Sequence, residues 1–258
     1  MIRELFKEQR PLMITGLILF LGLAILAIVS MFDSTEILGI NRWIKPMKFF
    51  VSTAIFVWTT AIYLYYLKDY KKSARLISWG IIFIFFVELF IVVMQAARGT
   101  TSHFNHKTPF DGMMFSVMGI MILLNTILAA YLLFLYFRAE IDLPQSIVWG
   151  MRLGLILFLA ACFEGGYMSA QIGHSVGAAD GGAGLPLVNW STRGGDLRVA
   201  HFFGMHAFQA VPFFAYTVEK YRIKSPIVWT FIFAIVYLSV FTFLFIQALH
   251  GQPLFQWV

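Results

Sequence analysis

Charged residues and cysteines are the two things that this sequence has little of. Only 12% of its 258 residues are charged and 60% are hydrophobic, whereas about 25% of the residues in a soluble globular domain are charged. A water-soluble surface around so much apolar material is therefore excluded. The single cysteine, Cys162, excludes an internal disulfide framework, and the aromatic content of 17% excludes a disordered chain. The class that remains is an integral membrane protein.

Several catalytic signatures are missing as well. The sequence has no P-loop, no G-x-S-x-G elbow and no H-E-x-x-H motif. No lysine lies in its last apolar run, so a retinal Schiff base of the microbial-rhodopsin kind has no attachment point there. The twelve methionines are dispersed among apolar segments, which is typical of packing rather than of copper binding.

Seven apolar runs are long enough to cross a bilayer as helices, which takes about 20 residues each. They cover roughly 12–32, 46–67, 76–97, 110–137, 147–171, 199–218 and 226–248. None of them alternates with period two, so we predict an all-α fold, a single transmembrane domain of seven helices over 1–258. The first run is longer than the apolar core of a signal peptide, and we expect it to be retained.

The distribution of Lys and Arg predicts the orientation. The loops on one side of the seven runs hold twelve of these residues and the loops on the other side hold seven. The richer side is expected to be cytoplasmic, which places the N-terminus inside and the C-terminus outside a bacterial inner membrane. The isoelectric point near 9.5 reflects this bias and requires no nucleic-acid partner.

The longest predicted loop is glycine-rich and lies on the outer side. Residues 172–198 include seven glycines, and loops of this length are commonly functional. Because the loop also contains apolar residues such as Leu185 and Trp190, we expect it to fold as a lid over the outer mouth.

Polar residues follow the outer halves of the predicted helices. All six histidines fall on or near the outer side, and Glu88 and Glu164 each lie about 15 Å below the outer end of a helix. An ionisable residue at that depth indicates a functional site by default. The alternative is that both glutamates are satisfied partners of neighbouring helices, with no ligand.

These residues predict an outward-facing pocket that reaches the bilayer midplane. The candidates for catalysis are Glu88, Glu164, Asp111 and His206. The candidates for substrate binding are Lys48, Gln95, Arg98, Tyr167, Trp190, Arg198 and Gln209. The positive charge of the outer mouth favours an anionic group, and the membrane setting favours a lipophilic one. Thr108 or Asp111 is expected to cap the helix that starts near Pro109. Asp196 is expected to cap the helix over 199–218.

The histidines predict either a metal site or a haem site. His103, His106, His174 and His201 supply the ligand types of zinc or iron, with an open position that would activate water. His201 and His206 are five residues apart, which is a poor spacing for one ion. Two histidines could instead hold haem b for electron transfer. A hydrogen-bonded network without any cofactor is the third interpretation.

Four strings carry a resemblance to uncharacterised bacterial multi-helix membrane proteins. They are Ser-His-Phe-Asn at 102–105, Thr-Pro-Phe-Asp at 108–111, His-Ser-Val-Gly at 174–177 and Gly-Asp-Leu-Arg-Val-Ala-His-Phe at 195–202. The resemblance implies a membrane bundle and no particular activity. Ser102-x-x-x-His106 also resembles a motif of the seven-helix zinc hydrolases of the alkaline ceramidase and adiponectin-receptor type, although their H-x-x-x-H pair is missing.

The leading functional prediction is a membrane protein that binds, and as an enzyme would hydrolyse, a lipophilic or anionic substrate with a metal ion. A haem-based electron-transfer protein and a transporter or ligand sensor are the alternatives. The apolar inner halves of the helices offer little for a path through the membrane, which counts against transport.

Overall fold

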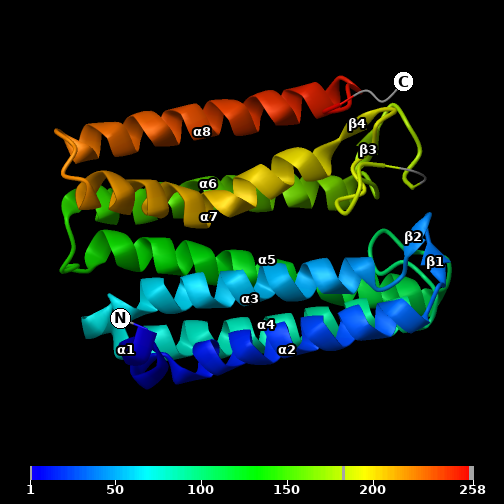
Figure 1. Ribbon diagram of the computed structural model, residues 1–258, viewed down its shortest axis with the longest axis horizontal. Helices are drawn as coiled ribbons and strands as arrows, with labels where there is room; N and C mark the ends of the chain where they lie inside the picture. Colours follow the sequence, from blue (N-terminus) through cyan, green and yellow to red (C-terminus); the bar gives the residue numbers. More distant parts are fainter. Residues whose placement is uncertain (1, 182–183, 256–258) are drawn as a thin grey trace. The chain divides into compact units, whose positions relative to one another are not determined.

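A computed structural model of the chain describes residues 2–181 and 184–255, and these are mainly helical (Figure 1). The α-helices are α1 (Ile2–Glu8), α2 (Arg10–Phe32), α3 (Ile44–Tyr65), α4 (Lys71–Ala97), α5 (Pro109–Arg138), α6 (Gln145–Ala170), α7 (Leu197–Lys220) and α8 (Pro226–Leu249). A short 3-10 helix, η1 (Lys68–Tyr70), precedes α4. All seven predicted runs are helices, and their bounds differ from the prediction by a few residues.

In the part of the chain that the structure describes, two small antiparallel strand pairs occur in the longer connections. Strand β1 (Glu36–Ile37) pairs with β2 (Ile40–Asn41), and Leu38 and Gly39 between them both have positive φ. Strand β3 (Ser175–Val176) pairs with β4 (Gly195–Asp196). The second pair brings the two ends of the predicted 172–198 loop together, directly before α7 begins.

Among the described residues, six helices are long and apolar enough to span a membrane. They are α2, α3, α4, α5, α6 and α8, and the candidate span at α4 begins at Lys68. Helix α7 has 24 residues but does not meet the same test, because polar side chains are distributed along it. These include Arg198, His201, His206, Gln209 and Glu219. The six apolar helices are consistent with a membrane protein.

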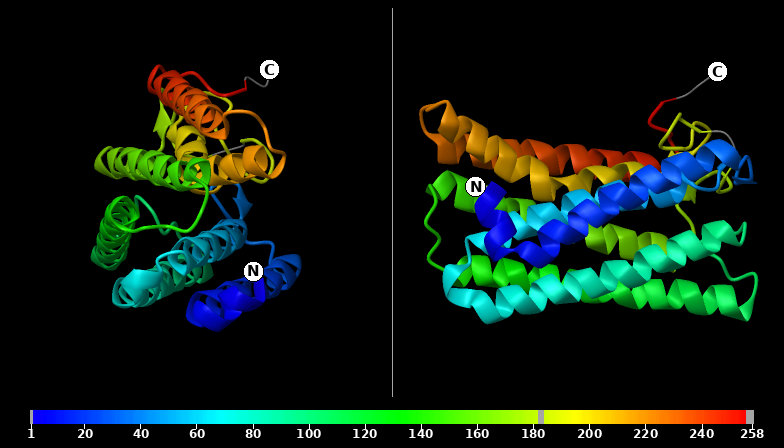
Figure 2. Two further views of the ribbon diagram at one scale, coloured as in Figure 1. Left: turned by 90° about the vertical axis from the view of Figure 1, so that its left-hand side faces the viewer. Right: turned by 60° about the horizontal axis from the view of Figure 1, so that its bottom comes forward.

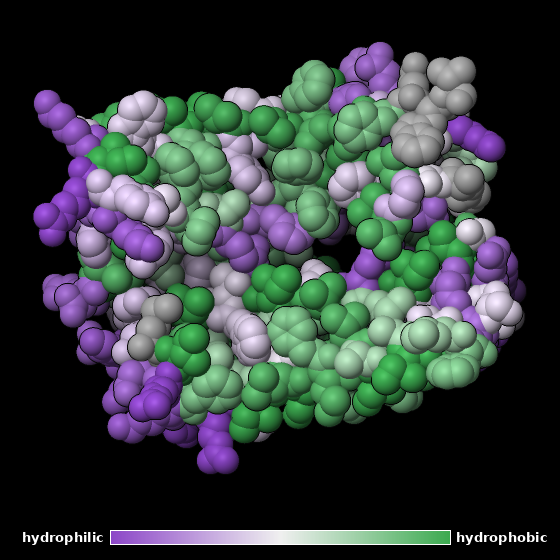
Figure 3. Space-filling view, in the orientation of Figure 1, coloured by the Kyte–Doolittle hydropathy of each residue, from purple (hydrophilic) through white to green (hydrophobic). Residues whose placement is uncertain are grey.

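The exposed faces of these helices are apolar, as lipid requires. On α4 the aromatic side chains of Trp79, Phe83, Phe86 and Phe90 recur every three or four residues and are all exposed. Figure 3 shows hydrophobic residues along α2 and α8, with hydrophilic residues gathered at the helix ends. In water such surfaces would drive aggregation, whereas hydrocarbon solvates them.

The chain divides into two compact units, residues 1–128 and 129–258. In the first unit, α2 and α3 pack closely because aromatic rings of α3 cover glycines of α2. The ring of Trp58 lies against Gly16 and that of Phe50 against Gly22. The Trp58 indole N–H also donates to the carbonyl oxygen of Met13 over 3.1 Å, so its polar atom is satisfied inside the unit.

In the second unit, α7 lies beside both α6 and α8 (Figures 1 and 2). Small residues let the backbones approach. A Cβ atom placed on Gly150 of α6 would be 2.7 Å from the Cβ of Ala215, and one on Gly204 of α7 would be 2.6 Å from the Cβ of Ala161. Interfaces of small residues are characteristic of helices that associate within membranes.

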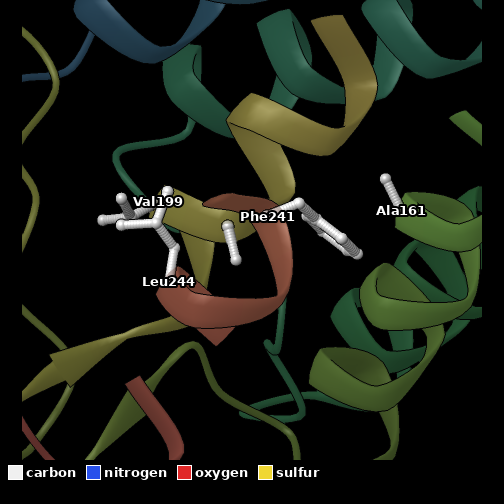
Figure 4. Close-up of a cluster of buried hydrophobic side chains, with 5 residues drawn as sticks. Ala161, Val199, Phe241 and Leu244 are labelled. Carbon is white, nitrogen blue, oxygen red and sulfur yellow. The ribbon is translucent and has the colours of Figure 1, made fainter. Parts of the chain in front are cut away.

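A buried apolar cluster holds the same three helices near the start of α7. It contains Ala161 of α6, Val199 and Ala200 of α7, and Phe241 and Leu244 of α8 (Figure 4). The Phe241 ring would be only 2.7 Å from a Cβ on Gly204. The absence of a side chain at Gly204 is therefore what admits the ring.

Two glycine substitutions test this packing. Gly204→Ala is expected to destabilise the protein by about 1–3 kcal/mol, because the added methyl overlaps Ala161 and Phe241. Gly166→Ala is the matched control, since it is also helical and a Cβ there meets nothing within 4 Å. It is expected to be neutral or stabilising. Thermal unfolding in detergent measures both, and equal midpoints for the two variants would contradict the close approach.

Candidate functional site

The predicted site residues form separate groups within each unit. In the first unit Gln95, Arg98 and Asp111 come together, and Glu88 lies deeper in α4. In the second unit Glu164 contacts His201, and His174 lies beside Asp196. Each group is described in turn, because the residues of one unit are not placed relative to those of the other.

The Asp111 group joins the end of α4 to the start of α5. Asp111 Oδ1 accepts hydrogen bonds from Gln95 Nε2 at 2.9 Å and Arg98 Nη1 at 2.7 Å, and Oδ2 accepts from Thr108 Oγ1 at 2.7 Å. The Arg98 guanidinium also donates to the side-chain oxygen of Gln95 and stacks on Phe110. Arg98, predicted to hold an anionic substrate group, is therefore already neutralised by a carboxylate.

The start of α5 follows the predicted capping. The backbone N–H of Asp111 donates to Thr108 Oγ1 over 3.1 Å, and Pro109 is the first helical residue. This confirms Thr108 as the capping residue. Asp111 contributes its charge near the positive end of the helix dipole, which suits its position in the first turn.

The two histidines between α4 and α5 contact aromatic rings. His103 Nδ1 is 3.0 Å from Ser102 Oγ, and its ring lies edge-on to Phe49 of α3 at 5.4 Å between centroids. His106 is exposed and meets the ring of Phe115 edge-on at 5.5 Å. Both contacts fix the connection against the first turns of α3 and α5.

Glu88 is a buried polar residue of the first unit, and its side chain makes no hydrogen bond to the described residues. Its side chain is buried, with 1% of the residue exposed, and neither carboxylate oxygen has a hydrogen-bond partner among the described residues. The positive charge that acts on it is Lys45, near the start of α3. Asn125 of α5 is also buried and has an unpartnered Oδ1.

The buried Glu164 of α6 pairs with the partly exposed His201 of α7. His201 Nδ1 is 2.8 Å from Glu164 Oε2 and 3.1 Å from the carbonyl oxygen of Ala161. Because a carbonyl oxygen can only accept, Nδ1 carries the hydrogen, and Nε2 of the neutral ring keeps its lone pair. The ring lies over Gly165, where an added Cβ would be 2.8 Å from its Cε1 atom.

Glu164 Oε1 and His201 Nε2 have no hydrogen-bond partner among the described residues. Glu164 Oε1 is buried and unpartnered, and His201 is hydrogen-bonded through Nδ1 alone. The His201 side chain is 31% exposed, so its ring is reachable from outside the bundle. A carboxylate that orients a histidine and leaves Nε2 free is the arrangement used in general-base catalysis and in metal ligation.

Asp196 caps α7 and binds Arg198. Asp196 Oδ1 accepts from the backbone N–H of Arg198 at 3.0 Å and from its Nε at 2.9 Å, while Oδ2 accepts from Nη2 at 2.6 Å. The N–H of Ser191 adds a bond of 2.7 Å, and His174 Nδ1 lies 3.7 Å away. The predicted N-cap is confirmed, and Arg198, like Arg98, is neutralised.

The surroundings of Asp196 act on its pKa in opposite directions. Burial raises the pKa, but the hydrogen bonds and charge of Arg198, the charge of His174 and the Ser191 N–H outweigh it, so the pKa of Asp196 lies below its ordinary value. The carboxylate is therefore ionised at neutral pH and holds the start of α7 to the preceding loop.

The described part of the 172–198 segment is tied down by Asp180. Its carboxylate accepts from the backbone N–H groups of His174 and Ser175, at 3.1 and 2.8 Å. Further along, Leu185 N donates to the Trp190 carbonyl oxygen at 2.9 Å, and the Trp190 ring lies edge-on to Phe202 of α7. The segment therefore rests on the first turns of α7, whereas a lid motion stays a prediction.

The remaining predicted residues lie outside these groups. His206 Nδ1 is 2.6 Å from the Phe202 carbonyl oxygen and its ring packs on that of Phe202, so His206 does not join the pair of Glu164 and His201. Tyr167 is exposed and meets Phe245 edge-on. Lys48 and Gln209 are half-buried.

Sequence reasoning missed the group around Asp33. Asp33 Oδ2 accepts from Arg42 Nε at 2.6 Å and from the Trp43 indole at 2.8 Å, and Oδ1 accepts from Thr35 N at 3.0 Å. The hydrogen bonds from Thr35, followed by those from Trp43 and Arg42, hold the pKa of Asp33 well below its usual range. The signal was present, because Asp33 is followed within ten residues by Arg42 and Trp43, whose side chains both donate hydrogen bonds that a carboxylate accepts.

No group of three or more His, Cys, Asp or Glu that could hold a metal ion occurs in residues 2–181 and 184–255. The predicted quartet of His103, His106, His174 and His201 combines residues of both units, and its metal site stays a prediction. Comparison of the chain with protein-family models, curated proteins and solved structures gives no match. The function must therefore be argued from these geometries.

A pH-dependent stability difference tests the Asp196 group. Asp196→Asn should cost about 3 kcal/mol at neutral pH, because it leaves Arg198 without its buried partner. The folded-state pKa lies below the ordinary value of 3.8, so this stabilisation is complete above that value and is lost as the pH falls through the folded pKa. The gap between wild type and variant in thermal midpoint should therefore narrow below about pH 4.

Asp142→Asn serves as the control, because Asp142 is an exposed aspartate in the connection from α5 to α6. Its midpoint should follow the wild type at every pH. A gap for Asp196→Asn that stays constant into acid would show that the carboxylate charge contributes nothing.

Proposed function

We propose that the chain is a seven-span protein of a bacterial inner membrane, in which α7 crosses the membrane in addition to the six apolar helices. Its 24 residues give about 36 Å of helix, enough for the hydrocarbon core. Helix α7 packs against both α6 and α8, which limits how much of its polar surface would face lipid. The bias of Lys and Arg supports an inner N-terminus and an outer C-terminus, so that the start of α7 faces outward.

His201, oriented by Glu164, is the working residue of a membrane-embedded site in this proposal. The observation that carries it is the 2.8 Å contact between Nδ1 and the buried carboxylate, which leaves the Nε2 lone pair free. Such a ring can take a proton from a ligand hydroxyl or bind one metal ion. Glu164 lies six residues before the end of α6 and His201 is the fifth residue of α7, and their position near the proposed outer ends of these helices supports access from outside.

The unsatisfied atoms favour a lipophilic ligand that donates hydrogen bonds over an anionic one. Arg98 and Arg198 are bound to Asp111 and Asp196. The buried carboxylates Glu88 and Glu164 instead keep oxygens without partners in the described chain. A buried acceptor without a donor costs about 1–3 kcal/mol, which a ligand hydroxyl or amine would recover. The substrate is therefore a lipophilic molecule with such a group.

Substitution of His201 tests this site. Detergent-purified His201→Ala should retain at least 10-fold less of any co-purifying lipophilic hydroxyl or amine compound than the wild type, as judged by mass spectrometry of the extract. That loss corresponds to one hydrogen bond to a charged or polar partner, about 1.5–3 kcal/mol. Gly165→Ala should give a similar loss, because it displaces the ring without removing it.

His206→Ala is the matched control, since this histidine of the same helix bonds to its own backbone. An optical spectrum and elemental analysis of the same samples separate the chemistries. A stoichiometric colourless metal lost only in His201→Ala would make His201 a ligand and favour a hydrolase, whereas a Soret band would favour the haem alternative. Equal ligand and metal content in His201→Ala and wild type would refute the site.

Glu88 favours a second candidate, a transporter or sensor that handles protons. Ionisable residues inside a membrane mark proton and ion paths, and both Glu88 oxygens are unpartnered among the described residues. In vesicles containing a pH-sensitive dye, an imposed potential should then acidify the lumen through the wild type. Glu88→Gln should remove at least nine-tenths of that flux, while Glu219→Gln, at the end of α7, should leave it intact. The absence of flux through the wild type would contradict this candidate.

A further inference from the structure

An apolar groove with a basic rim lies between the start of α2 and residues 79–82 of α4, within the first unit. It is lined by Arg10, Pro11, Ile14 and Thr15 of α2 and by Trp79 and Ile82 of α4. Its volume of about 340 Å³ lies at the lower end of the range for small-ligand sites, roughly 300–1,000 Å³. The groove is open at the surface, where Ile14 and Trp79 are 38% and 57% exposed.

Basic side chains stand at the end of the groove nearest the helix starts. Arg10 is the first residue of α2 and itself lines the groove. On α4, the residues Lys72, Arg75, Trp79 and Ile82 follow at spacings of three, four and three, so they share one face of the helix. Arg75 is therefore one turn closer to the start of α4 than Trp79 is.

The basic residues of this rim form no ion pair with another residue of the described chain. Arg10, Lys72 and Arg75 are exposed, and none of them forms an ion pair within the described part of the chain. This distinguishes them from Arg42, Arg98 and Arg198, each of which is bound to an aspartate. Uncompensated guanidinium groups beside an apolar groove call for a ligand that has an anionic head and an apolar body.

We propose that the groove binds one anionic phospholipid, with its phosphate on Arg10 and Arg75 and an acyl chain against Ile14 and Ile82. A guanidinium pairs with phosphate through two hydrogen bonds, which a choline headgroup weakens by its own positive charge. In this proposal Trp79 lies near the boundary between hydrocarbon and headgroups, where tryptophans are enriched, and basic pockets between membrane helices bind anionic headgroups. The site requires only that α2 and α4 lie in a membrane, and not that His201 binds a ligand.

Lipid retention measured by native mass spectrometry tests the headgroup contact. The protein is purified in detergent, and phosphatidylglycerol and phosphatidylcholine of equal acyl length are added in equal amounts. The wild type should retain phosphatidylglycerol at least 10-fold in excess, and Arg10→Gln/Arg75→Gln should reduce that preference to near one. Lys220→Gln/Lys224→Gln removes the same charge from the second unit and should leave the preference unchanged. An unchanged preference in the Arg10/Arg75 variant would overturn the proposal.

The acyl contact needs its own pair of variants. Ile14→Trp fills the groove and should reduce retention of both lipids at least 5-fold, whereas Ile18→Trp, one turn further along α2 and outside the groove lining, should not. Monodisperse elution on size exclusion establishes that each variant is folded. Glycerol 1-phosphate should not displace the lipid at millimolar concentration. Displacement by that headgroup alone, or equal retention by both tryptophan variants, would show that the groove takes no acyl chain.

Discussion

The close contact of α7 with α6 and α8 is the constraint on which the second unit depends. Polar side chains on α7 would be costly in lipid, since each needs a hydrogen-bond partner or water. Gly204, Gly150 and Ala161 remove the bulk that would keep the helices apart. With the backbones in contact, the carbonyl of Ala161 and the carboxylate of Glu164 reach His201. The close packing that the small residues allow is therefore also what brings Glu164 and His201 together.

Charge neutralisation at the helix ends follows a common pattern in both units. Asp33 binds Arg42, Asp111 binds Arg98, and Asp196 binds Arg198. In the last two cases the aspartate lies at or beside the start of a helix, where the dipole favours negative charge. These pairs stabilise the connections and leave no excess positive charge on those arginines. Two buried carboxylates keep oxygens without a hydrogen-bond partner in the described chain: Glu88 in the first unit, and in the second unit Glu164, which contacts His201.

The helices could be predicted closely because hydrocarbon imposes simple rules. A span needs about 20 apolar residues, and every backbone group must bond within its helix, so composition alone located the runs from 12–32 to 226–248. The caps Thr108 and Asp196 were predictable for a similar reason, since a side-chain oxygen before a helix meets free N–H groups three residues on. The short α1 and the two strand pairs were not predicted, because they depend on contacts between neighbouring segments rather than on periodicity.

The sequence located the polar residues of the helices but did not predict which of them pair. Glu88, Glu164, Gln95, Arg98, Asp111 and Arg198 were all identified as polar residues of outer helix halves. The assignment of Arg98 and Arg198 to substrate failed to include their aspartate partners, which lie 13 and 2 residues away in the sequence. His201 and His206 were correctly separated by their spacing, since five residues place them on different faces.

The sequence by itself determined that this chain is helical and suited to a membrane, because burial of apolar area and backbone satisfaction are local properties of each segment. Only the tertiary structure decided which polar groups neutralise one another and which are left over. That outcome depends on distances of about 3 Å between groups far apart in the sequence, such as the side chains of Glu164 and His201, which are 37 residues apart. Such distances are set by how closely the helix backbones approach. That approach depends on a few glycines, which have no side chain to keep the helices apart.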